Sequence, residues 1–518
     1  MDANLIKTLL QPAPYEQPTA TVSLIQTHIS FLFLTDTHVY KIKKPVDFGF
    51  LDFTTLEKRR YYCHEELRLN RRLSPDIYLG VVELRRGPDG KIAFNGQGEV
   101  IEYAVKMLRL PAERMMSRLL EEDRVTAADI KAIARLVAEF HGAAARSPEI
   151  DRFGDIDLIR ANWNENLRQV RPYIGRTISP DSFRQLETWM EAQLAGREPL
   201  IRSRISDGFI RECDGDLHSE NICLDSKVHI FDCIEFNEKF RYSDTAADVA
   251  FLFMDLENHG RRQLAELFLA EYIAASGDLT IAATVPLYLP IRAFIRGKVE
   301  SFRLDDPAIN ADEKLAAAGR ANRFFRLAHG YTLRGVLPLS LFITCAPTGC
   351  GKSALARELS LLLGIDHIST DIERKRLAGI LPTERGEDIY TREWHQRTYD
   401  CVAGLTRERL VKNESVLVDG TFCRKNDRDS FAALARENGS RLVILRLNCP
   451  PEVVRQRLHA RQQEPAAVSD GTWEVYQHQS AGMVEPTGTE GLLLQLDGTL
   501  PPQELAARVL DLIGAAGK

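Results

Sequence analysis

The chain has 518 residues, enough for about three folding units of ordinary size. Hydrophobic residues make up 44% and charged residues 27%, close to the globular average, which excludes a mainly disordered or fibrous protein. The net charge of −6 argues against a protein that is basic overall and binds nucleic acid through its general surface.

Cysteine usage and the N-terminal sequence predict the compartment. Nine cysteines are spread along the chain, with no Cys-x-x-Cys pair and no spacing typical of a zinc site. The first residues, MDANLIKTLLQPAPYEQP, show no basic segment followed by a long apolar one, and no run of eighteen apolar residues occurs. We therefore expect a cytoplasmic protein without a structural metal, an export signal or a membrane span.

The N-terminal region begins with a small sheet and continues with helices. Residues 21–46 alternate apolar and polar side chains around a polar turn at Asp36 and Thr37, which predicts an antiparallel hairpin. A helical segment, three short strands and two amphipathic helices follow, at residues 53–73, 81–84, 91–94, 101–110, 127–144 and 182–194.

After residue 338 short apolar runs alternate with helical segments, which is typical of βαβ units and predicts a doubly wound parallel sheet. Five such runs occur, at residues 339–345, 365–369, 415–419, 441–447 and 492–496. The join between the two regions falls near residues 326–338, so we predict one domain over residues 1–330 and a second over residues 338–518. Residues 462–471 are rich in turn formers and predict a loop.

The clearest motif is A-P-T-G-C-G-K-S, which follows an apolar strand and opens a helix. Gly349 and Gly351 allow backbone N–H groups to face inward, and the helix N-terminus adds partial positive charge where phosphates would bind. Lys352 would reach the β- and γ-phosphates of ATP, and Ser353 would offer its hydroxyl to Mg²⁺. The alternative is a glycine-rich strand–helix turn without a ligand. The predicted nucleotide contacts are Ala346, Pro347, Thr348, Gly349, Cys350, Gly351, Lys352, Ser353 and Ala354.

Further polar residues of the C-terminal region fit a phosphotransferase. Asp371 follows the second strand and would take the proton of an attacking hydroxyl, or else cap the next helix. Asp419 ends the third strand and would hold the metal through water, or else act as a turn residue. Arg457 and Arg461 lie on one helical face and would close over the transferred phosphoryl group; the alternative is a solvated basic face that includes Arg455.

With these residues, the segment 339–518 resembles the P-loop kinases of small molecules and nucleic-acid ends. This group includes gluconate and shikimate kinases, zeta-toxin-like kinases and the kinase part of polynucleotide kinase. The resemblance implies their sheet order and lid, and it supports the roles given above to Lys352, Ser353, Asp371, Asp419, Arg457 and Arg461. It does not identify the acceptor; the candidate acceptor contacts, with a surface role as the alternative, are Arg374, Arg424 and Arg428.

A second motif lies in the N-terminal region, where CDGDLHSENICL precedes VHIFDCIEF. It places Asp216 and Asn221 in the relation D-x-x-x-x-N, followed by an apolar strand that ends in Asp232. Asp216 would accept the proton of a substrate hydroxyl, while Asn221 and Asp232 would hold Mg²⁺ on the ATP phosphates. Each residue taken alone is also a common turn former.

Residues 20–325 resemble the aminoglycoside phosphotransferase branch of the protein-kinase-like fold, whose loop typically reads HGDLHxxN. Here Asp214 replaces the first His. The resemblance implies that Lys41 contacts the α- and β-phosphates and that Glu66 is its ion-pair partner. Because Lys43 lies on the same strand face and Glu65 adjoins Glu66, either assignment can shift to the neighbour.

The resemblance also implies a covering loop, a hinge and a brace for the catalytic segment. No G-x-G-x-x-G occurs between the first two strands, where residues 27–30 read THIS. Residues 106–110 fall where the family has its adenine-contacting hinge. Asp248 would brace the catalytic segment, with a plain helical salt bridge as the alternative.

Taken together, the chain resembles bacterial fusions of an aminoglycoside-phosphotransferase-like enzyme with a P-loop kinase domain. We therefore expect a bilobal protein-kinase-like fold followed by a doubly wound α/β domain, with two sites for ATP and Mg²⁺ and a small-molecule or nucleotide-like hydroxyl acceptor. One alternative is a nucleotide-sensing regulator whose N-terminal half binds ATP without catalysis. Another is a kinase of nucleic-acid ends, which the acidic balance does not favour. No membrane partner is expected.

Overall fold

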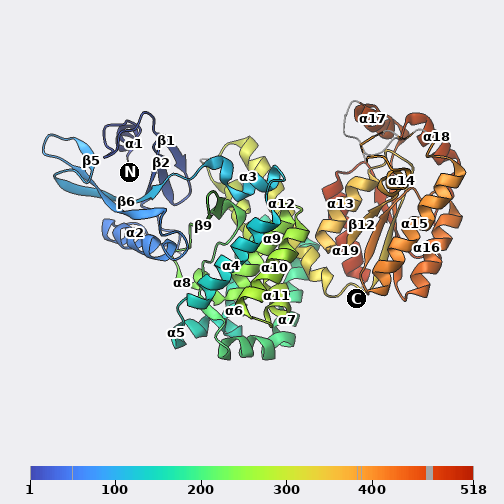
Figure 1. Ribbon diagram of the computed structural model, residues 1–518, viewed down its shortest axis with the longest axis horizontal. Helices are drawn as coiled ribbons and strands as arrows, with labels where there is room; N and C mark the ends of the chain where they lie inside the picture. The colour runs from blue at the N-terminus through green and yellow to red at the C-terminus, as the bar shows by residue number, and fades with distance from the viewer. Residues whose placement is uncertain are drawn as a thin grey trace. The chain divides into compact units, whose positions relative to one another are not determined.

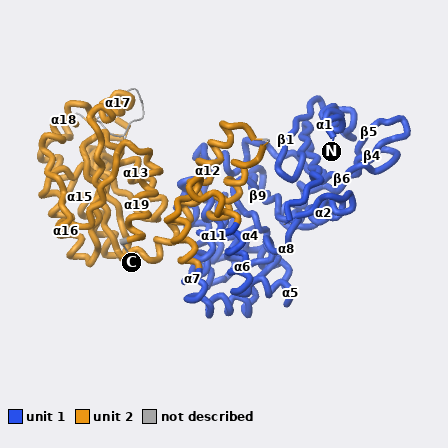
Figure 2. The backbone as a smooth tube through the Cα atoms, turned by 180° about the vertical axis from the view of Figure 1, so that it is seen from behind, with its two compact units in different colours: residues 1–168, 191–292 blue, residues 169–190, 293–518 orange. Residues whose placement is uncertain are grey.

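The structure is a computed structural model that describes residues 2–49, 51–307, 309–381, 383–384, 386, 388–462 and 471–516. The chain divides into two compact units that are discontinuous in sequence (Figure 2). Unit 1 comprises residues 1–168 and 191–292, and unit 2 comprises residues 169–190 and 293–518. The domain limits 1–330 and 338–518 stay a prediction. Most of the loop predicted at residues 462–471 lies outside the described residues.

Unit 1 begins with helix α1 (Ala3–Leu9) and a six-stranded antiparallel sheet in the order β1-β2-β3-β6-β4-β5. The strands are β1 (Ser23–Gln26), β2 (Ser30–Leu34), β3 (His38–Lys43), β4 (Tyr78–Arg86), β5 (Ile92–Phe94) and β6 (Glu99–Leu108). The predicted hairpin is present as β2 and β3, with Phe33 opposite Tyr40, while β1 is a separate strand that the hairpin pattern did not resolve. The buried side chains of β2 and β3 pack on α1 and exclude water from this face.

Helix α2 (Leu56–Asn70) covers the other side of this sheet, where Cys63 packs on Tyr78 and Val105. Thr55 caps its N-terminus by accepting the backbone N–H of Lys58. The helices that follow, some of which continue into unit 2, are α3 (Met116–Glu121), α4 (Ala127–Ala143), α5 (Pro148–Asp151), α6 (Ile156–Val170), α7 (Pro180–Ser206), α9 (Thr245–Asn258), α10 (Arg262–Ser276) and α11 (Ile281–Phe302). The N-terminal motif is carried by short elements, β7 (Ile210–Glu212), β8 (Ile222–Leu224), β9 (Val228–Ile230), α8 (Glu238–Arg241) and β10 (Tyr242–Asp244).

Unit 2 contains a parallel sheet in the order β12-β13-β11-β14-β15, built from the five strands that the sequence predicted. They are β11 (Ser340–Cys345), β12 (Asp366–Ser369), β13 (Val416–Asp419), β14 (Arg441–Asn448) and β15 (Leu492–Asp497). The helices of this unit are α12 (Ala311–Arg334), α13 (Lys352–Leu363), α14 (Thr370–Ala378), α15 (Arg392–Val411), α16 (Lys425–Glu437), α17 (Pro451–Gln462), α18 (Trp473–Ala481) and α19 (Pro502–Ala516). Figure 1 shows α13 and α19 on one face of the sheet and α15 and α16 on the other.

Both faces of this sheet are therefore buried, which explains why its central strands are almost continuously apolar. The carboxyl ends of the five strands meet at one edge, where the P-loop segment follows β11. Among the described residues, no helix is both long and apolar enough to cross a membrane. None of the nine cysteines forms a disulfide.

Candidate active sites

The loop that carries Asp216 lies between β7 and β8 of unit 1. Asn221 Nδ2 donates to Asp216 Oδ2 at 3.1 Å and to the Asp216 carbonyl at 3.1 Å. His218 Nε2 lies 3.3 Å from the same carboxylate oxygen. Gly215 has a φ of 90°, and a Cβ there would lie 2.7 Å from the carbonyl oxygen of Phe240, so this turn requires glycine. The structure thus brings Asp216 and Asn221 into direct contact.

Asp248, on α9, fixes the backbone of this loop. Its carboxylate accepts the N–H groups of Asp214 at 2.7 Å and Gly215 at 3.0 Å, and it is fully buried. Burial alone favours the neutral acid, but His141 at 3.4 Å and Arg292 at 3.7 Å help to hold the pKa of Asp248 below its usual value. Of the two roles considered for Asp248, the geometry supports the brace.

Asp214, which stands where the resembling family has His, is also buried. Its Oδ1 accepts the backbone N–H of Asp216 at 3.1 Å, which adds an internal hydrogen bond to the loop. Burial, together with the nearby Asp248 carboxylate, raises the pKa of Asp214 well above its ordinary value. A neutral Asp214 avoids repulsion between two buried carboxylates at the base of the loop.

Lys41, Glu66 and Asp232 meet between β3, α2 and the segment after β9. Lys41 Nζ lies 2.8 Å from Glu66 Oε1 and 2.5 Å from Asp232 Oδ1. Asp232 has a φ of 66°, a left-handed conformation that is strained for a residue with a side chain. Its N–H donates to the Tyr78 hydroxyl at 3.1 Å, which helps to fix this conformation.

The structure shows how the alternative residues Lys43 and Glu65 are paired. Lys43 also reaches Glu66, with 2.7 Å between Nζ and Oε2, so both strand lysines share this glutamate. Glu65 instead pairs with Arg68 on the outside of α2. The sequence placed both lysines on one strand face but gave no signal for a second buried carboxylate, Glu235, which pairs with Lys43.

The resemblance implied a phosphate-covering loop between β1 and β2 and an adenine-contacting hinge at residues 106–110. Thr27 closes the β1–β2 turn, because its Oγ1 accepts the N–H of Ile29 at 3.3 Å and of Ser30 at 2.9 Å. This tight turn presents no glycine-rich backbone to a phosphate. At residues 106–110, where the resemblance implies a hinge, Lys106 Nζ pairs with Glu16 at 2.8 Å.

In unit 2 the P-loop segment joins the end of β11 to the start of α13. Gly349 and Gly351 have φ values of 81° and 92°, and a Cβ on Gly349 would lie 2.7 Å from a methyl of Val454. Lys352 begins α13, and its Nζ donates to the Pro347 carbonyl at 2.8 Å, so the side chain folds back over the loop. This strand–loop–helix arrangement is the one that places a helix N-terminus against phosphate.

Asp419, at the end of β13, is buried beside Ser353. Thr344 Oγ1 lies 3.3 Å from its Oδ1, and His367 Nε2 lies 3.7 Å from its Oδ2. Burial disfavours the charged form, but His367, Lys352 and Ser353 hold the pKa of Asp419 below its usual value. A carboxylate and a hydroxyl together are oxygen ligands of the kind that Mg²⁺ prefers, so this donor set fits the predicted cofactor.

Asp371 lies in the first turn of α14, while the N-cap position is Ser369, so the helix-cap alternative for Asp371 is wrong. Its carboxylate accepts from Arg374 Nη1 at 2.8 Å. The guanidinium of Arg374 also stacks on Tyr390, with 4.9 Å to the ring centre. This guanidinium therefore holds the carboxylate that we predict as the proton acceptor.

The predicted arginines separate into different environments. Arg457 Nη1 donates to the carbonyl of Gly498 at 2.7 Å, and a Cβ on Gly351 would lie 3.5 Å from the same nitrogen. Arg457 therefore lies beside the P-loop and contacts the turn after β15. Arg461 is partly exposed in the last turn of α17, and Arg455 stacks on Trp473 at 5.6 Å.

The prediction that Arg428 contacts the acceptor is wrong. It is fully buried, its Nε donates to Glu490 Oε2 at 2.6 Å, and its Nη1 donates to the Phe422 carbonyl at 2.9 Å. Its role is to tie α16 to the segment before β15. Arg424 is exposed immediately before α16, so the structure leaves it accessible.

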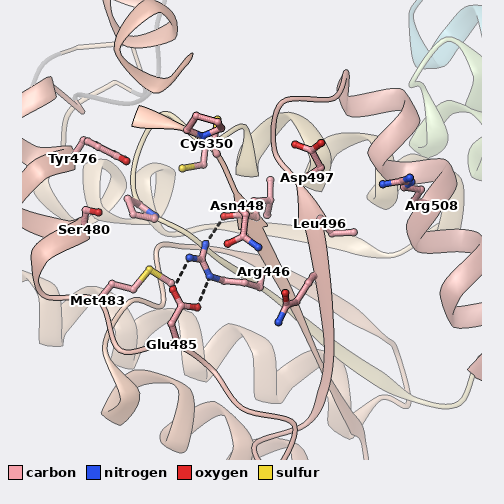
Figure 3. A pocket seen from close by; sticks show the side chains of 15 residues that line it. Cys350, Arg446, Asn448, Tyr476, Ser480, Met483, Glu485, Leu496, Asp497 and Arg508 are labelled. Atoms are coloured by element: carbon pink, nitrogen blue, oxygen red, sulfur yellow. Dashed lines mark hydrogen bonds and ion pairs between the residues drawn. The ribbon is translucent and has the colours of Figure 1, made fainter. Parts of the chain in front are cut away.

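A cavity of about 670 Å³ lies beside the P-loop and is lined by Pro347 and Cys350, by the ends of β14 and β15, and by α18. Figure 3 shows Arg446 and Glu485 side by side in the lining of this cavity; their side chains form two hydrogen bonds of 2.9 and 2.7 Å. The volume is in the range of small-molecule sites. Sequence reasoning missed this cavity because its walls come from segments that are far apart in the chain.

Fold and site together define the C-terminal part as a P-loop nucleotide-binding domain. A family model described as an AAA domain matches residues 341–486. Over 460 residues the chain is 32% identical to an uncharacterized protein of Mycobacterium tuberculosis (strain CDC 1551 / Oshkosh), and the match covers 88% of each chain. The chain belongs to the same protein family as this mycobacterial protein.

Other similarities are confined to parts of the chain or are weaker. Over 217 residues the chain is 26% identical to an adenylate kinase of Moorella thermoacetica, covering 34% of this chain and 97% of that protein. The solved structure of a choline/ethanolamine kinase family protein from Mesorhizobium loti is 14% identical, covers 62% of this chain and 92% of that chain, and gives a TM-score of 0.36.

Proposed function

We propose that the chain is an ATP- and Mg²⁺-dependent phosphotransferase whose acceptor is a hydroxyl group of a small-molecule or nucleotide-like compound. The P-loop geometry carries this proposal, because Gly349 and Gly351 adopt the backbone conformations that the loop needs and Lys352 begins a helix beside them. The match to an adenylate kinase of Moorella thermoacetica, which covers 34% of this chain, supports it.

At the C-terminal site, Ser353 and Asp419 would hold the metal and Lys352 would bind the phosphates. When bound, Mg²⁺ neutralises charge on the phosphate oxygens. Asp371 would receive the proton of the acceptor hydroxyl while the γ-phosphoryl group leaves ADP and bonds to the acceptor oxygen. The guanidinium of Arg374 already holds the Asp371 carboxylate, so it orients that carboxylate before the proton arrives.

At the N-terminal site, Asp216 would take the corresponding proton, and Asn221 and Asp232 would hold the metal. Lys41 would exchange its contact with Asp232 for the nucleotide phosphates and keep its contact with Glu66. Carboxylate and amide oxygens form this donor set, which fits Mg²⁺. The proposal therefore includes two sites that transfer phosphoryl groups independently.

The test is label transfer from γ-labelled ATP to compounds in a metabolite extract. We expect Lys352→Ala to remove one set of labelled products and Asp216→Asn to remove the other, while Arg455→Ala, a matched exposed charge change, leaves both sets. The double variant Lys352→Ala/Asp216→Asn should label nothing above background. Unchanged products from the double variant would contradict the assignment of both sites.

A nucleotide sensor at the N-terminal site is the second candidate, favoured by the tight turn at Thr27 where a phosphate-covering loop was expected. In a Lys352→Ala background such a sensor binds ATP but shows no turnover that depends on an added hydroxyl compound. Acceptor-stimulated ADP release in that background would exclude the sensor and favour the kinase.

A further inference from the structure

The N-terminal site contains a second buried lysine–glutamate pair in addition to Lys41 and Glu66. Lys43 is fully buried and its Nζ contacts Glu66 Oε2 at 2.7 Å, so the two oxygens of Glu66 each bind a different strand lysine. Lys43 Nζ also forms a close ion pair with Glu235, which is buried as well. A buried lysine requires such partners, because an unpaired charge in this environment is strongly unfavourable.

The pair connects three parts of the site. Lys41 and Lys43 are two residues apart on β3, and Asp232 and Glu235 are three residues apart in the segment after β9. Lys41 contacts Asp232 and Lys43 contacts Glu235, while both lysines contact Glu66 of α2. Two parallel ion pairs therefore tie the segment that carries Asp232 to the strand and the helix.

The ion pairs Lys41–Asp232 and Lys43–Glu235 differ in their exposure to solvent. The side chain of Asp232 is 45% exposed, so its contact with Lys41 is open to exchange with a metal ion and phosphate. The side chains of Lys43 and Glu235 are 0% and 4% exposed, so their contact is shielded from such ligands. If Lys41 exchanged Asp232 for a nucleotide, the contact between Lys43 and Glu235 would still connect this segment to β3.

We propose that Lys43 and Glu235 are positioning residues that hold Asp232 in its metal-binding conformation without touching the nucleotide. This inference rests on the proposed function of the N-terminal site. The strained φ of 66° at Asp232 is the conformation that they help to maintain, together with the hydrogen bond to Tyr78. Groups that orient a metal ligand from behind commonly alter metal affinity by roughly 10- to 100-fold when they are removed.

The experiment measures Mg²⁺-dependent ATP binding in the full chain with Lys352→Ala, so that the P-loop site is disabled. The double variant Lys43→Met/Glu235→Met removes both partners and leaves no uncompensated charge between them. We expect its apparent Mg²⁺ affinity to fall roughly 10- to 100-fold, with unchanged ATP binding in the presence of a chelator. The control Lys91→Met/Asp89→Asn removes an exposed pair in the turn between β4 and β5 and should change neither value.

Equal Mg²⁺ dependence in the double variant and the control would overturn the positioning role, as would an equal loss of binding with and without Mg²⁺. If the double variant does not fold, Glu235→Gln repeats the test, because Lys43 keeps Glu66 as a partner and Gln keeps the size of the side chain. If the Lys352→Ala parent itself shows no Mg²⁺-dependent ATP binding, the N-terminal site of the proposed function fails, and the positioning role fails with it.

Discussion

Asp248 shows how one side chain can set the backbone of a candidate catalytic loop. Its two carboxylate oxygens accept two consecutive N–H groups, and both bonds are buried. Asn at this position keeps one accepting oxygen, while its NH₂ group would face a second N–H donor. A buried donor left unsatisfied costs about 1–3 kcal/mol.

We therefore expect Asp248→Asn to lower the free energy of unfolding by about 1–3 kcal/mol, as measured by urea denaturation. The exposed residue Asp225 provides the control, since Asp225→Asn should change stability by less than about 0.5 kcal/mol. Equal stability of Asp248→Asn and wild type would mean that the loop does not depend on this brace.

A buried histidine gives unit 2 a pH-dependent stability. His329 Nδ1 lies 3.0 Å from Ser182 Oγ, and its Nε2 lies 2.9 Å from Gln185 Oε1. Burial lowers the pKa of His329 to about 4. At His329 the unfolded chain therefore binds more protons than the folded one between pH 6.5 and 4, and this residue's contribution to stability falls as the pH falls through that window. The neighbouring Asp511, whose burial raises its pKa to about 6, contributes in the opposite direction and is present in both proteins compared below.

We compare His329 with a side chain that does not titrate. Relative to it, His329 contributes on the order of 3 kcal/mol more to the free energy of unfolding at pH 7 than below pH 4. We expect the stability difference between wild type and His329→Gln to shift in favour of the variant as the pH is lowered from 7 to 4. Urea denaturation at a series of pH values measures it. A difference that is independent of pH would show that His329 titrates normally.

The loop before helix α13 requires a left-handed backbone conformation at Gly351. Gly351 has a φ of 92°, and a Cβ added there would meet only Arg457, at 3.5 Å. Substitution by alanine is therefore a test of strain rather than of steric overlap. A residue held in this conformation costs on the order of 1–3 kcal/mol.

We expect Gly351→Ala to reduce ATP binding at the P-loop site at least tenfold, because the loop relieves strain by moving away from its phosphate-binding conformation. Isothermal titration with Mg²⁺ and ATP in an Asp232→Asn background, which removes a proposed metal ligand of the N-terminal site, would measure the affinity. Gly319→Ala is the matched control, since Gly319 lies within α12 with open space around it. This substitution should stabilise the helix by about 0.5–1 kcal/mol and leave ATP binding unchanged. Normal affinity in Gly351→Ala would contradict the strain argument.

At the scale of the whole chain, helix α13 of the P-loop unit packs against α12, a helix that begins before the predicted domain limit. Gly330 of α12 approaches α13 so closely that a Cβ there would lie 2.3 Å from the Leu362 carbonyl. Arg334 Nη2 donates to the Leu361 carbonyl at 2.8 Å and so satisfies an acceptor at the C-terminus of α13. Helix α12 is therefore part of the compact unit that contains the P-loop.

We expect a fragment of residues 311–518, which includes α12, to melt at a higher temperature than a fragment of residues 335–518. The shorter fragment exposes the apolar surface of α13 and α19 and leaves the carbonyls at the end of α13 without Arg334. Thermal denaturation by circular dichroism compares the two. Equal melting temperatures would show that the P-loop sheet folds without α12.

The sequence by itself determined the elements whose signals are local. The five parallel strands appear where apolar runs alternate with helical segments, and the P-loop appears where glycines separate a strand from a helix. Asp216 and Asn221 were also predicted together, because five residues of chain keep them close. In these cases the relevant distance along the chain is short, so composition and spacing carry the information.

Only the tertiary structure decided the contacts between distant segments. It showed that Arg428 forms a buried ion pair with Glu490, that Lys43 shares Glu66 and pairs with Glu235, and that α12 packs on α13. An isolated sequence does not show these because an ion pair or helix contact depends on which surfaces folding brings together. Burial, which sets both the partners and the pKa of each charged group, is a property of the folded chain as a whole.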